Sequence, residues 1–316
     1  MISIWIKSTA IAMSIAASGS GSWFNSSPLS AGGLHGKVVL VNFWTYSCIN
    51  SLRPLSYVKN LAEKYKAAGL TVIGVHSPEF GFERDRSNVA TAAHNLHLIY
   101  PIIMDSDHRI WKAFANDAWP AFYLVDANGR IRYRYLGEGR YSEIERNLQQ
   151  LLRENGSNEV SRSVENVSGT GSEAPANLTE ERSPETYIGS DRAERVAAGG
   201  SSLGLNQWRL SGQWNVRPES ALLEVPRGKI VFRFHSRDLH LVLSLAHGKE
   251  PVRYRVTLDG VAPGPNCGGD CGPNGAGEVR QPRLYHLIRQ RGAVKDRTFE
   301  IEFFDPGVRA YAFTFG

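Results

Sequence analysis

A strand that runs directly towards a cysteine is the feature that most constrains the fold of this chain. The apolar, largely β-branched run Val38–Val41 is typical of a strand that is covered on both faces of a sheet. Leu52, Leu55 and Val58 then recur at helical spacing, so Cys48 is predicted to lie where a strand gives way to a helix. At a helix N-terminus the dipole and the unpaired N–H groups favour a thiolate, and the pKa of a cysteine falls from ~8.5 towards ~3.5–7.5 in the strongest cases.

Serine stands at position 51, where a dithiol exchange site has its second cysteine. A dithiol site needs one thiolate to attack and a second thiol to release the substrate from the mixed disulfide. Ser51 can donate a hydrogen bond to a thiolate but cannot release the substrate. Trp44 and Tyr46 precede Cys48 and complete the candidate catalytic segment, which is a poor place for an inert, buried cysteine.

Two further residues are candidates for this site. Trp119-Pro120 introduces a strand, a position at which a cis proline can hold the backbone close to a partner sulfur. Glu79 follows the second buried strand, Gly69–His76, and can accept or relay a proton near the thiol. The alternatives are a trans, structural proline and a solvated loop glutamate.

Composition and pattern predict two folded domains in the 316 residues. Residues 1–22 resemble a weak secretory signal, with a disordered leader or a membrane remnant as the alternative. Residues 23–153 alternate strand and helix signals, which indicates an α/β domain. Residues 154–183 are rich in Ser, Asn, Glu and Gly and are predicted to be a flexible linker. Residues 184–316 contain eight short strand signals, which favour an all-β antiparallel sandwich or jelly roll.

Within the β-domain, Asp191–Ala198 is the one helix candidate. Four aromatic residues there could stack on sugar rings, although aromatics in a sandwich more often form the core: Trp208, Trp214, Tyr254 and Tyr285. A glycan is therefore a candidate ligand of this domain.

Cysteine and charge patterns exclude several classes of protein. The formal charge of +5 comes from dispersed Lys and Arg without a nucleic-acid motif, so no nucleic-acid partner is expected. Three cysteines are too few for a disulfide scaffold. Cys267 and Cys271 flank a glycine-rich loop, which favours a local disulfide, with a metal site, a calcium loop through Asp259 and Asp270, or a redox relay to Cys48 as alternatives. We expect neither a cofactor nor a metal.

Several motifs together resemble the periplasmic thioredoxin-like domain of the DipZ family, which is related to TlpA-type oxidoreductases. The first half carries the likeness in Phe43–Asn50, His76–Phe80, Trp119–Gly129 and Gly137–Tyr141. The second half resembles that family's C-terminal β-domain, a carbohydrate-binding-module-like jelly roll. Its motifs are Pro184–Gly189, Leu258–Gly260, Arg283–Arg289 and Asp305–Gly316.

The resemblance implies a thioredoxin fold that is exported to an oxidising compartment and exchanges electrons with substrate thiols. We expect a periplasmic or secreted protein, with its leader as a candidate tether. Cys48 matches the attacking cysteine and Pro120 the proline that faces it, while Ser51 departs from the family's Cys-x-x-Cys pair. It also implies a membrane-embedded electron donor, which we expect to be a separate protein.

The leading hypothesis is a monothiol thiol–disulfide oxidoreductase that forms mixed disulfides through Cys48 with protein or small-molecule thiols. One alternative is a redox-inactive protein that binds protein or glycan. A lesser one is a thiol peroxidase, because Thr45 and Cys48 match half of a peroxiredoxin signature, although Val41 stands where that signature has proline. Ser51 fits both a natural monothiol site and an engineered substitution that traps mixed disulfides.

Overall fold

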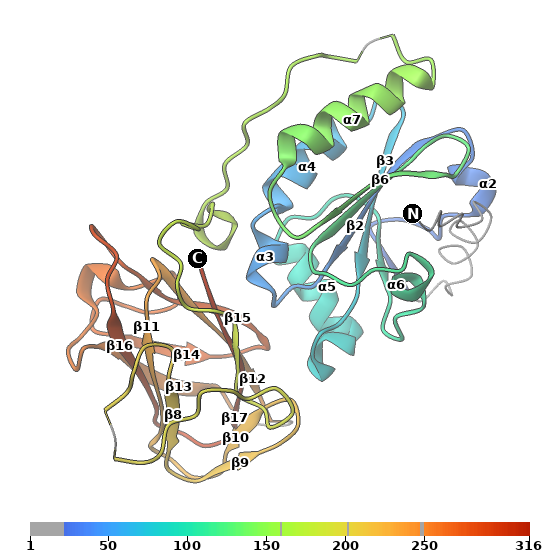
Figure 1. The fold of residues 1–316 in the computed structure, drawn as a ribbon. Helices are drawn as coiled ribbons and strands as arrows, with labels where there is room; N and C mark the ends of the chain where they lie inside the picture. Colours follow the sequence, from blue (N-terminus) through green and yellow to red (C-terminus); the bar gives the residue numbers. More distant parts are fainter. Residues whose placement is uncertain (1–21, 159, 201, 247–249) are drawn as a thin grey trace. The chain divides into compact units, whose positions relative to one another are not determined.

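The structure is a computed structural model that describes residues 22–158, 160–200, 202–246 and 250–316 (Figure 1). The contacts divide the chain into two compact units, with the division between Ala174 and Pro175. The predicted leader, residues 1–22, lies almost entirely outside the described residues.

A six-stranded mixed sheet forms the centre of the first unit, in the order β1-β4-β3-β2-β5-β6. β2, β3 and β4 are parallel neighbours, and β1, β5 and β6 pair antiparallel. The strands are β1 Trp23–Phe24, β2 Val38–Trp44, β3 Leu70–His76, β4 Ile102–Met104, β5 Ala121–Val125 and β6 Ile131–Leu136. Every residue of β2 is buried, as the apolar run predicted, because β2 lies in the middle of the sheet.

Helices cover both faces of this sheet. They are α2 Ala31–Leu34, α3 Ile49–Leu52, α4 Leu55–Lys64, α5 Arg86–Asn95, α6 Arg109–Ala113 and α7 Tyr141–Glu154, with 3₁₀ turns η2 Gly81–Arg84 and η3 Gly171–Glu173. Leu34 of α2 and Ile110 of α6 share a core with alternate residues of β2 and β3. On the opposite face α4 and α7 lie side by side (Figure 1), joined by a hydrogen bond from Tyr57 Oη to the Tyr141 carbonyl.

Local sequence signals explain where these elements begin and end. The α5 helix begins after Asp85, whose carboxylate accepts the backbone N–H groups of Ser87 and Asn88. The predicted turn between β5 and β6 is present, with Gly129 at a positive φ of 77°. Buried Ile144, Leu148, Leu151 and Leu152 form the predicted apolar face of the closing helix α7.

The second unit consists of two antiparallel sheets around one shared core. One sheet has the order β15-β12-β17-β10-β9, with β7 on β17, and the other has the order β14-β13-β16-β11-β8. The strands are β7 Thr186–Tyr187, β8 Trp208–Ser211, β9 Trp214–Val216, β10 Ala221–Leu223, β11 Gly228–Phe234, β12 Asp238–Leu245, β13 Val252–Leu258, β14 Ala276–Val279, β15 Arg283–Arg289, β16 Arg297–Phe303 and β17 Val308–Phe315. An all-β antiparallel domain therefore follows the α/β domain, as predicted.

Two predictions for this unit need correction. The helix predicted at Asp191–Ala198 is absent: this segment forms a turn and isolated bridges, and Arg195 adopts a left-handed φ of 57°. The strand predicted over Trp208–Val216 is divided between the two sheets as β8 and β9. Gly212 separates the two strands. Its φ of 98° favours glycine, and a Cβ added at this position would lie only 3.0 Å from Gly228 Cα.

Part of the segment predicted as a linker contacts the first unit. Lys64 pairs with Glu165 at 3.0 Å, and Lys59 pairs with Glu173 at 3.1 Å. The boundaries of the predicted linker, 154–183, and its flexibility stay predictions.

Candidate active site

Cys48 lies at the N-cap of α3, at the end of the loop that follows β2. Its backbone is extended, and its carbonyl accepts the N–H groups of Ser51 and Leu52 at 3.0 and 3.1 Å. Cys48 carries a thiol that is buried, with 8% of the residue's surface exposed. The structure thus contains the predicted strand-to-helix junction, although α3 is a single short turn that α4 continues after Pro54.

Ser51 is buried inside α3, one turn after Cys48. Its Oγ accepts the backbone N–H of Thr45 at 3.3 Å. This bond uses a lone pair and leaves the hydroxyl hydrogen as a donor. Ser51 therefore fastens the loop before Cys48 to the helix that follows it.

Pro120 follows a cis peptide bond from Trp119 and precedes β5. Since Ala121 pairs with Phe43, Pro120 lies at the end of β2 from which the Cys48 loop departs. The Pro120 carbonyl accepts the N–H of Gly137 at 2.8 Å. The register of β2 and β5 thus places the predicted proline at the C-terminal end of β2, the end that the Cys48 loop follows.

A partly buried ion pair joins the Cys48 helix to the loop after β6. Arg53, at the C-terminal end of α3, binds Glu138 at 2.7 Å, and Glu138 follows the glycine that binds the Pro120 carbonyl. Burial raises the pKa of Glu138, and the Arg53 charge opposes that rise. Sequence reasoning missed this pair, because its members lie 85 positions apart.

Glu83 is a fully buried carboxylate that holds the Cys48 loop and was not predicted. It accepts five hydrogen bonds: from Thr45 Oγ1 at 2.5 Å, Ser47 Oγ at 2.6 Å, Ser47 N at 3.3 Å, Glu79 N at 2.5 Å and Phe80 N at 2.9 Å. Burial raises the pKa of Glu83, while the bonds from Ser47, Thr45 and Phe80 lower it. Glu83 accepts the N–H of Phe80 as a capping-box glutamate does, but Phe80 stands where the capping-box signature has Ser or Thr, so this signature did not identify Glu83.

The predicted Glu79 contributes its backbone N–H to this network, while its side chain is partly exposed. A role of that side chain in moving a proton stays a prediction. The buried carboxylate that meets the Cys48 loop belongs to Glu83, four residues later.

Trp44 and Tyr46 are buried beneath the loop and pack on His76, the last residue of β3. The Tyr46 ring stacks on the imidazole at 5.5 Å, and the Trp44 ring meets it edge-on at 5.2 Å. His76 Nε2 lies 3.4 Å from Thr45 Oγ1. Burial lowers the pKa of His76 to about 3, so the ring is neutral at physiological pH.

The second unit contains the other candidates. Cys267 and Cys271 are joined in a disulfide, with Cα atoms 5.8 Å apart. Trp208, Tyr254 and Tyr285 are buried in the core, so they present no platform for a sugar ring. Within the described ranges no group of three or more His, Cys, Asp or Glu side chains could hold a metal ion.

Comparison with known proteins agrees with this geometry. The Redoxin family model matches residues 24–164, and the model for the Thioredoxin like C-terminal domain matches residues 183–316. The thiol-disulfide oxidoreductase YkuV of Bacillus subtilis is 30% identical over 118 residues, which cover 37% of this chain and 79% of YkuV. The chain belongs to the thioredoxin-like thiol–disulfide oxidoreductase family.

Other homologues match a longer part of the chain. The DipZ proteins of Mycobacterium bovis and Mycobacterium tuberculosis are each 35% identical over 238 residues. The match covers 70% of this chain and 33% of DipZ, so the chain spans about a third of the length of those relatives. A solved thioredoxin-like protein in the oxidized form is 29% identical, with a TM-score of 0.40, over 43% of this chain and 92% of that one. The two family models and the DipZ matches confirm the predicted family.

Proposed function

We propose that this protein is a monothiol oxidoreductase in which Cys48 forms mixed disulfides with protein or small-molecule thiols. The proposal rests on the positions of two residues: Cys48 is the N-cap of α3, and serine, not cysteine, stands one turn later at position 51. The other two cysteines of the chain are bonded to each other. Release of a substrate from Cys48 therefore passes to an external thiol.

The exchange balances without a cofactor. The Cys48 thiolate attacks one sulfur of a substrate disulfide, the Cys48–substrate bond forms, and the other substrate sulfur leaves as a thiolate. An external thiolate then attacks the substrate sulfur of the mixed disulfide and frees Cys48 as a thiolate. The external thiol and the substrate end in a disulfide, so the protein is unchanged over one cycle.

The hydrogen bonds around Thr45 weigh against the peroxidase alternative. Thr45 donates its only hydroxyl hydrogen to Glu83. That hydrogen is then not available to a peroxide beside Cys48, which a Thr-x-x-Cys peroxidase site requires. We therefore prefer disulfide exchange.

We also propose an oxidising compartment, periplasmic or secreted, and a separate membrane protein as electron donor. The local disulfide between Cys267 and Cys271 supports the first part, because such bonds persist in oxidising compartments. The second part rests on the resemblance to the DipZ family described above, as an analogy. Among the described residues no helix is long and apolar enough to cross a membrane.

A trapping experiment tests the monothiol mechanism. The protein is mixed with a disulfide substrate, such as oxidised glutathione, and the adduct on Cys48 is followed by intact mass. We expect the adduct to persist in the unmodified protein until a thiol is added. In the Ser51→Cys variant we expect the adduct to decay at least ~10-fold faster, because an intramolecular thiol replaces an external one.

Ser51→Ala is the matched control, since it also loses the serine but gains no sulfur. It should keep the adduct as the unmodified protein does. If Cys48 forms no adduct in any of the three proteins, the exchange mechanism is wrong, and the redox-inactive binding alternative takes its place.

A further inference from the structure

The disulfide of the second unit closes a short loop at the surface. Cys267 and Cys271 are four positions apart, between the 3₁₀ turn η4 (Gly264–Asn266) and β14. Both cysteines are partly exposed. The stabilisation that a disulfide gives grows with the length of the loop that it closes, so this bond contributes less by that route than a bond between distant positions.

Hydrogen bonds hold the same loop against β15 without help from the disulfide. The N–H of Gly268 donates to the Leu287 carbonyl at 2.9 Å, and the N–H of Asp270 donates to the His286 carbonyl at 3.0 Å. Gly268 is needed for this approach, because an added Cβ would lie 2.3 Å from the His286 carbonyl oxygen.

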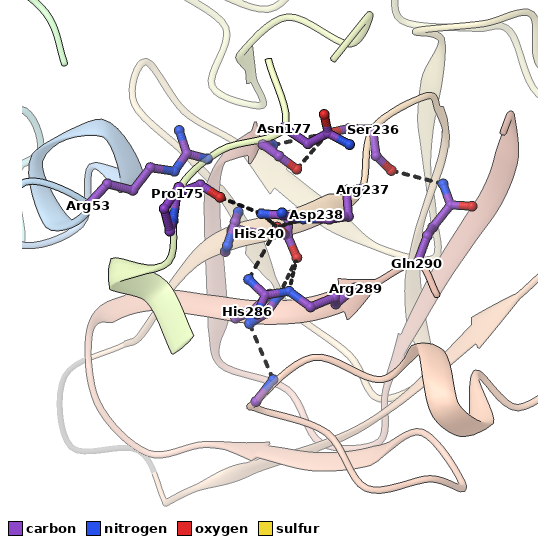
Figure 2. Close-up of polar contacts among 12 residues, drawn as sticks. Arg53, Pro175, Asn177, Ser236, Arg237, Asp238, His240, His286, Arg289 and Gln290 are labelled. Carbon is purple, nitrogen blue, oxygen red and sulfur yellow. Dashed lines mark hydrogen bonds and ion pairs between the residues drawn. The ribbon is translucent and has the colours of Figure 1, made fainter. Parts of the chain in front are cut away.

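The Asp270 side chain adds a second set of bonds. Its carboxylate accepts two hydrogen bonds from Arg283, at 2.6 and 3.0 Å, and one from the backbone N–H of His286 at 2.7 Å. His286 in turn lies between the loop and Asp238: Gly269 N is 3.4 Å from its Nδ1, and Asp238 Oδ1 is 2.9 Å from its Nε2 (Figure 2). The loop thus keeps a network of bonds to β15 when the disulfide is broken.

Both sulfur atoms have an acceptor within hydrogen-bond distance. Cys267 Sγ lies 3.0 Å from the Gly272 carbonyl oxygen, and Cys271 Sγ lies 3.2 Å from the Leu287 carbonyl oxygen. In the reduced protein each S–H can donate to its carbonyl. Both carbonyl oxygens are therefore candidate acceptors for the thiols, whose sulfur atoms move apart when the disulfide breaks.

We propose that Cys267 and Cys271 form a reversible redox pair, a second redox site that is reduced by an external dithiol while the β-domain stays folded. Accessible disulfides that the fold does not depend on are typically the labile, regulatory ones. This site does not require Cys48, so it stands independently of the monothiol mechanism.

The reduction is a two-electron exchange. A thiolate of the external dithiol attacks one sulfur of the pair, the bond between Cys267 and Cys271 breaks, and the leaving sulfur takes a proton. The second thiol of the reductant attacks the mixed disulfide and frees the other cysteine. The protein gains two electrons and two protons, and the reductant becomes a disulfide; a partner disulfide reverses the steps.

Graded reduction in the Cys48→Ser variant tests the proposal, because every thiol label then reports on the pair. The folded protein is treated with dithiothreitol and alkylated, and intact mass counts the labels while hydrogen exchange follows β12 and β15. We expect two labels with unchanged protection of both strands, and loss of the labels after treatment with oxidised glutathione. Labels that appear only when β12 and β15 lose protection would overturn the proposal.

Asp270→Asn separates the contribution of the hydrogen bonds from that of the disulfide. In this variant we expect reduction to speed exchange in residues 264–275 by more than ~10-fold, since the ion pair with Arg283 is lost. In the protein that keeps Asp270 we expect reduction to change the exchange rate of the same residues by less than ~3-fold. Equal, large changes in both proteins would identify the disulfide as a structural bond and contradict the proposal.

Asp305→Asn is the control, because Asp305 binds the side chain and backbone N–H of Arg253 in the same manner. It should leave the response of residues 264–275 as in the parent.

Discussion

Replacing Asp238 with asparagine is expected to lower the free energy of unfolding of the second unit by about 3 to 5 kcal/mol. Asp238 begins β12, and its side chain is 2% exposed. It accepts from Arg289 Nε at 2.6 Å, His286 Nε2 at 2.9 Å and Arg237 Nε at 2.8 Å (Figure 2). The asparagine amide is neutral, and its nitrogen donates where a carboxylate oxygen accepted. The guanidinium groups therefore lose an anionic acceptor, and because the site is buried, water cannot fully replace it.

The measurement is urea unfolding, followed by hydrogen exchange of peptides from β12 and β15. Glu300→Gln is the matched control, because Glu300 of β16 pairs with Lys229 at 2.9 Å and both side chains are partly exposed. Exposed pairs contribute about 0 to 1 kcal/mol, so this variant should unfold almost as the parent does. A similar small loss for Asp238→Asn would show that the buried cluster does not stabilise the unit.

Asp238→Asn should also change how the free energy of unfolding of the second unit depends on pH. Burial raises the pKa of Asp238, but the bonds from His286 and Arg289 outweigh it and hold the pKa well below its ordinary range. Below about pH 4 the unfolded chain therefore binds more protons than the folded one, and stability falls with pH. The stability difference between parent and Asp238→Asn should be full above about pH 5 and should shrink as the pH falls below 4.

Replacing Glu83 with alanine is expected to cost the first unit about 3 to 5 kcal/mol, because five buried donors lose their acceptor. Glu83→Gln keeps the shape and one carbonyl oxygen. The Thr45 and Ser47 hydroxyls can rotate to accept from the new amide, so a smaller loss of about 1 to 3 kcal/mol is expected. Urea unfolding measures both losses.

Glu79→Gln serves as the control in the same loop, because the Glu79 side chain is partly exposed and a loss below about 1 kcal/mol is expected. If Glu83 only stabilised the fold, its replacement would leave the pH profile of Cys48 alkylation unchanged. We therefore expect Glu83→Ala to speed hydrogen exchange in residues 45–52 and to change the pH profile of Cys48 alkylation, with partial rescue by glutamine. If alanine and glutamine leave both unchanged, Glu83 does not position the Cys48 loop.

Sequence predicted the elements whose signals are local. The run Val38–Val41 identified β2 because a central strand is apolar on both faces, and the helical spacing after Cys48 identified α3 and α4. Turn chemistry identified the hairpin at Gly129. The position of Pro120 before a strand left both a cis and a trans proline open, and the structure contains the cis form.

The rest depends on pairings that a single sequence does not reveal. Glu83 reaches Thr45 only because β2 and β3 are parallel neighbours, which brings the loops after both strands to one edge of the sheet. Asp238 meets His286 because β12 pairs with β15 across 48 positions. The predicted helix at Asp191–Ala198 was wrong because tertiary pairing outweighs the local pattern: Ala193 forms a bridge to Tyr187, and Val196 forms one to Trp208.

The pH dependence of Cys48 alkylation tests the central claim most directly. It is measured in protein whose Cys267 and Cys271 are both serine, so that every label reports on Cys48. A site built for exchange holds a thiolate, so we predict a rate profile with an apparent pKa well below the ~8.5 of an unperturbed cysteine. An apparent pKa at or above ~8.5 would contradict the account, since Cys48 would then be an inert thiol in a protein that acts by binding.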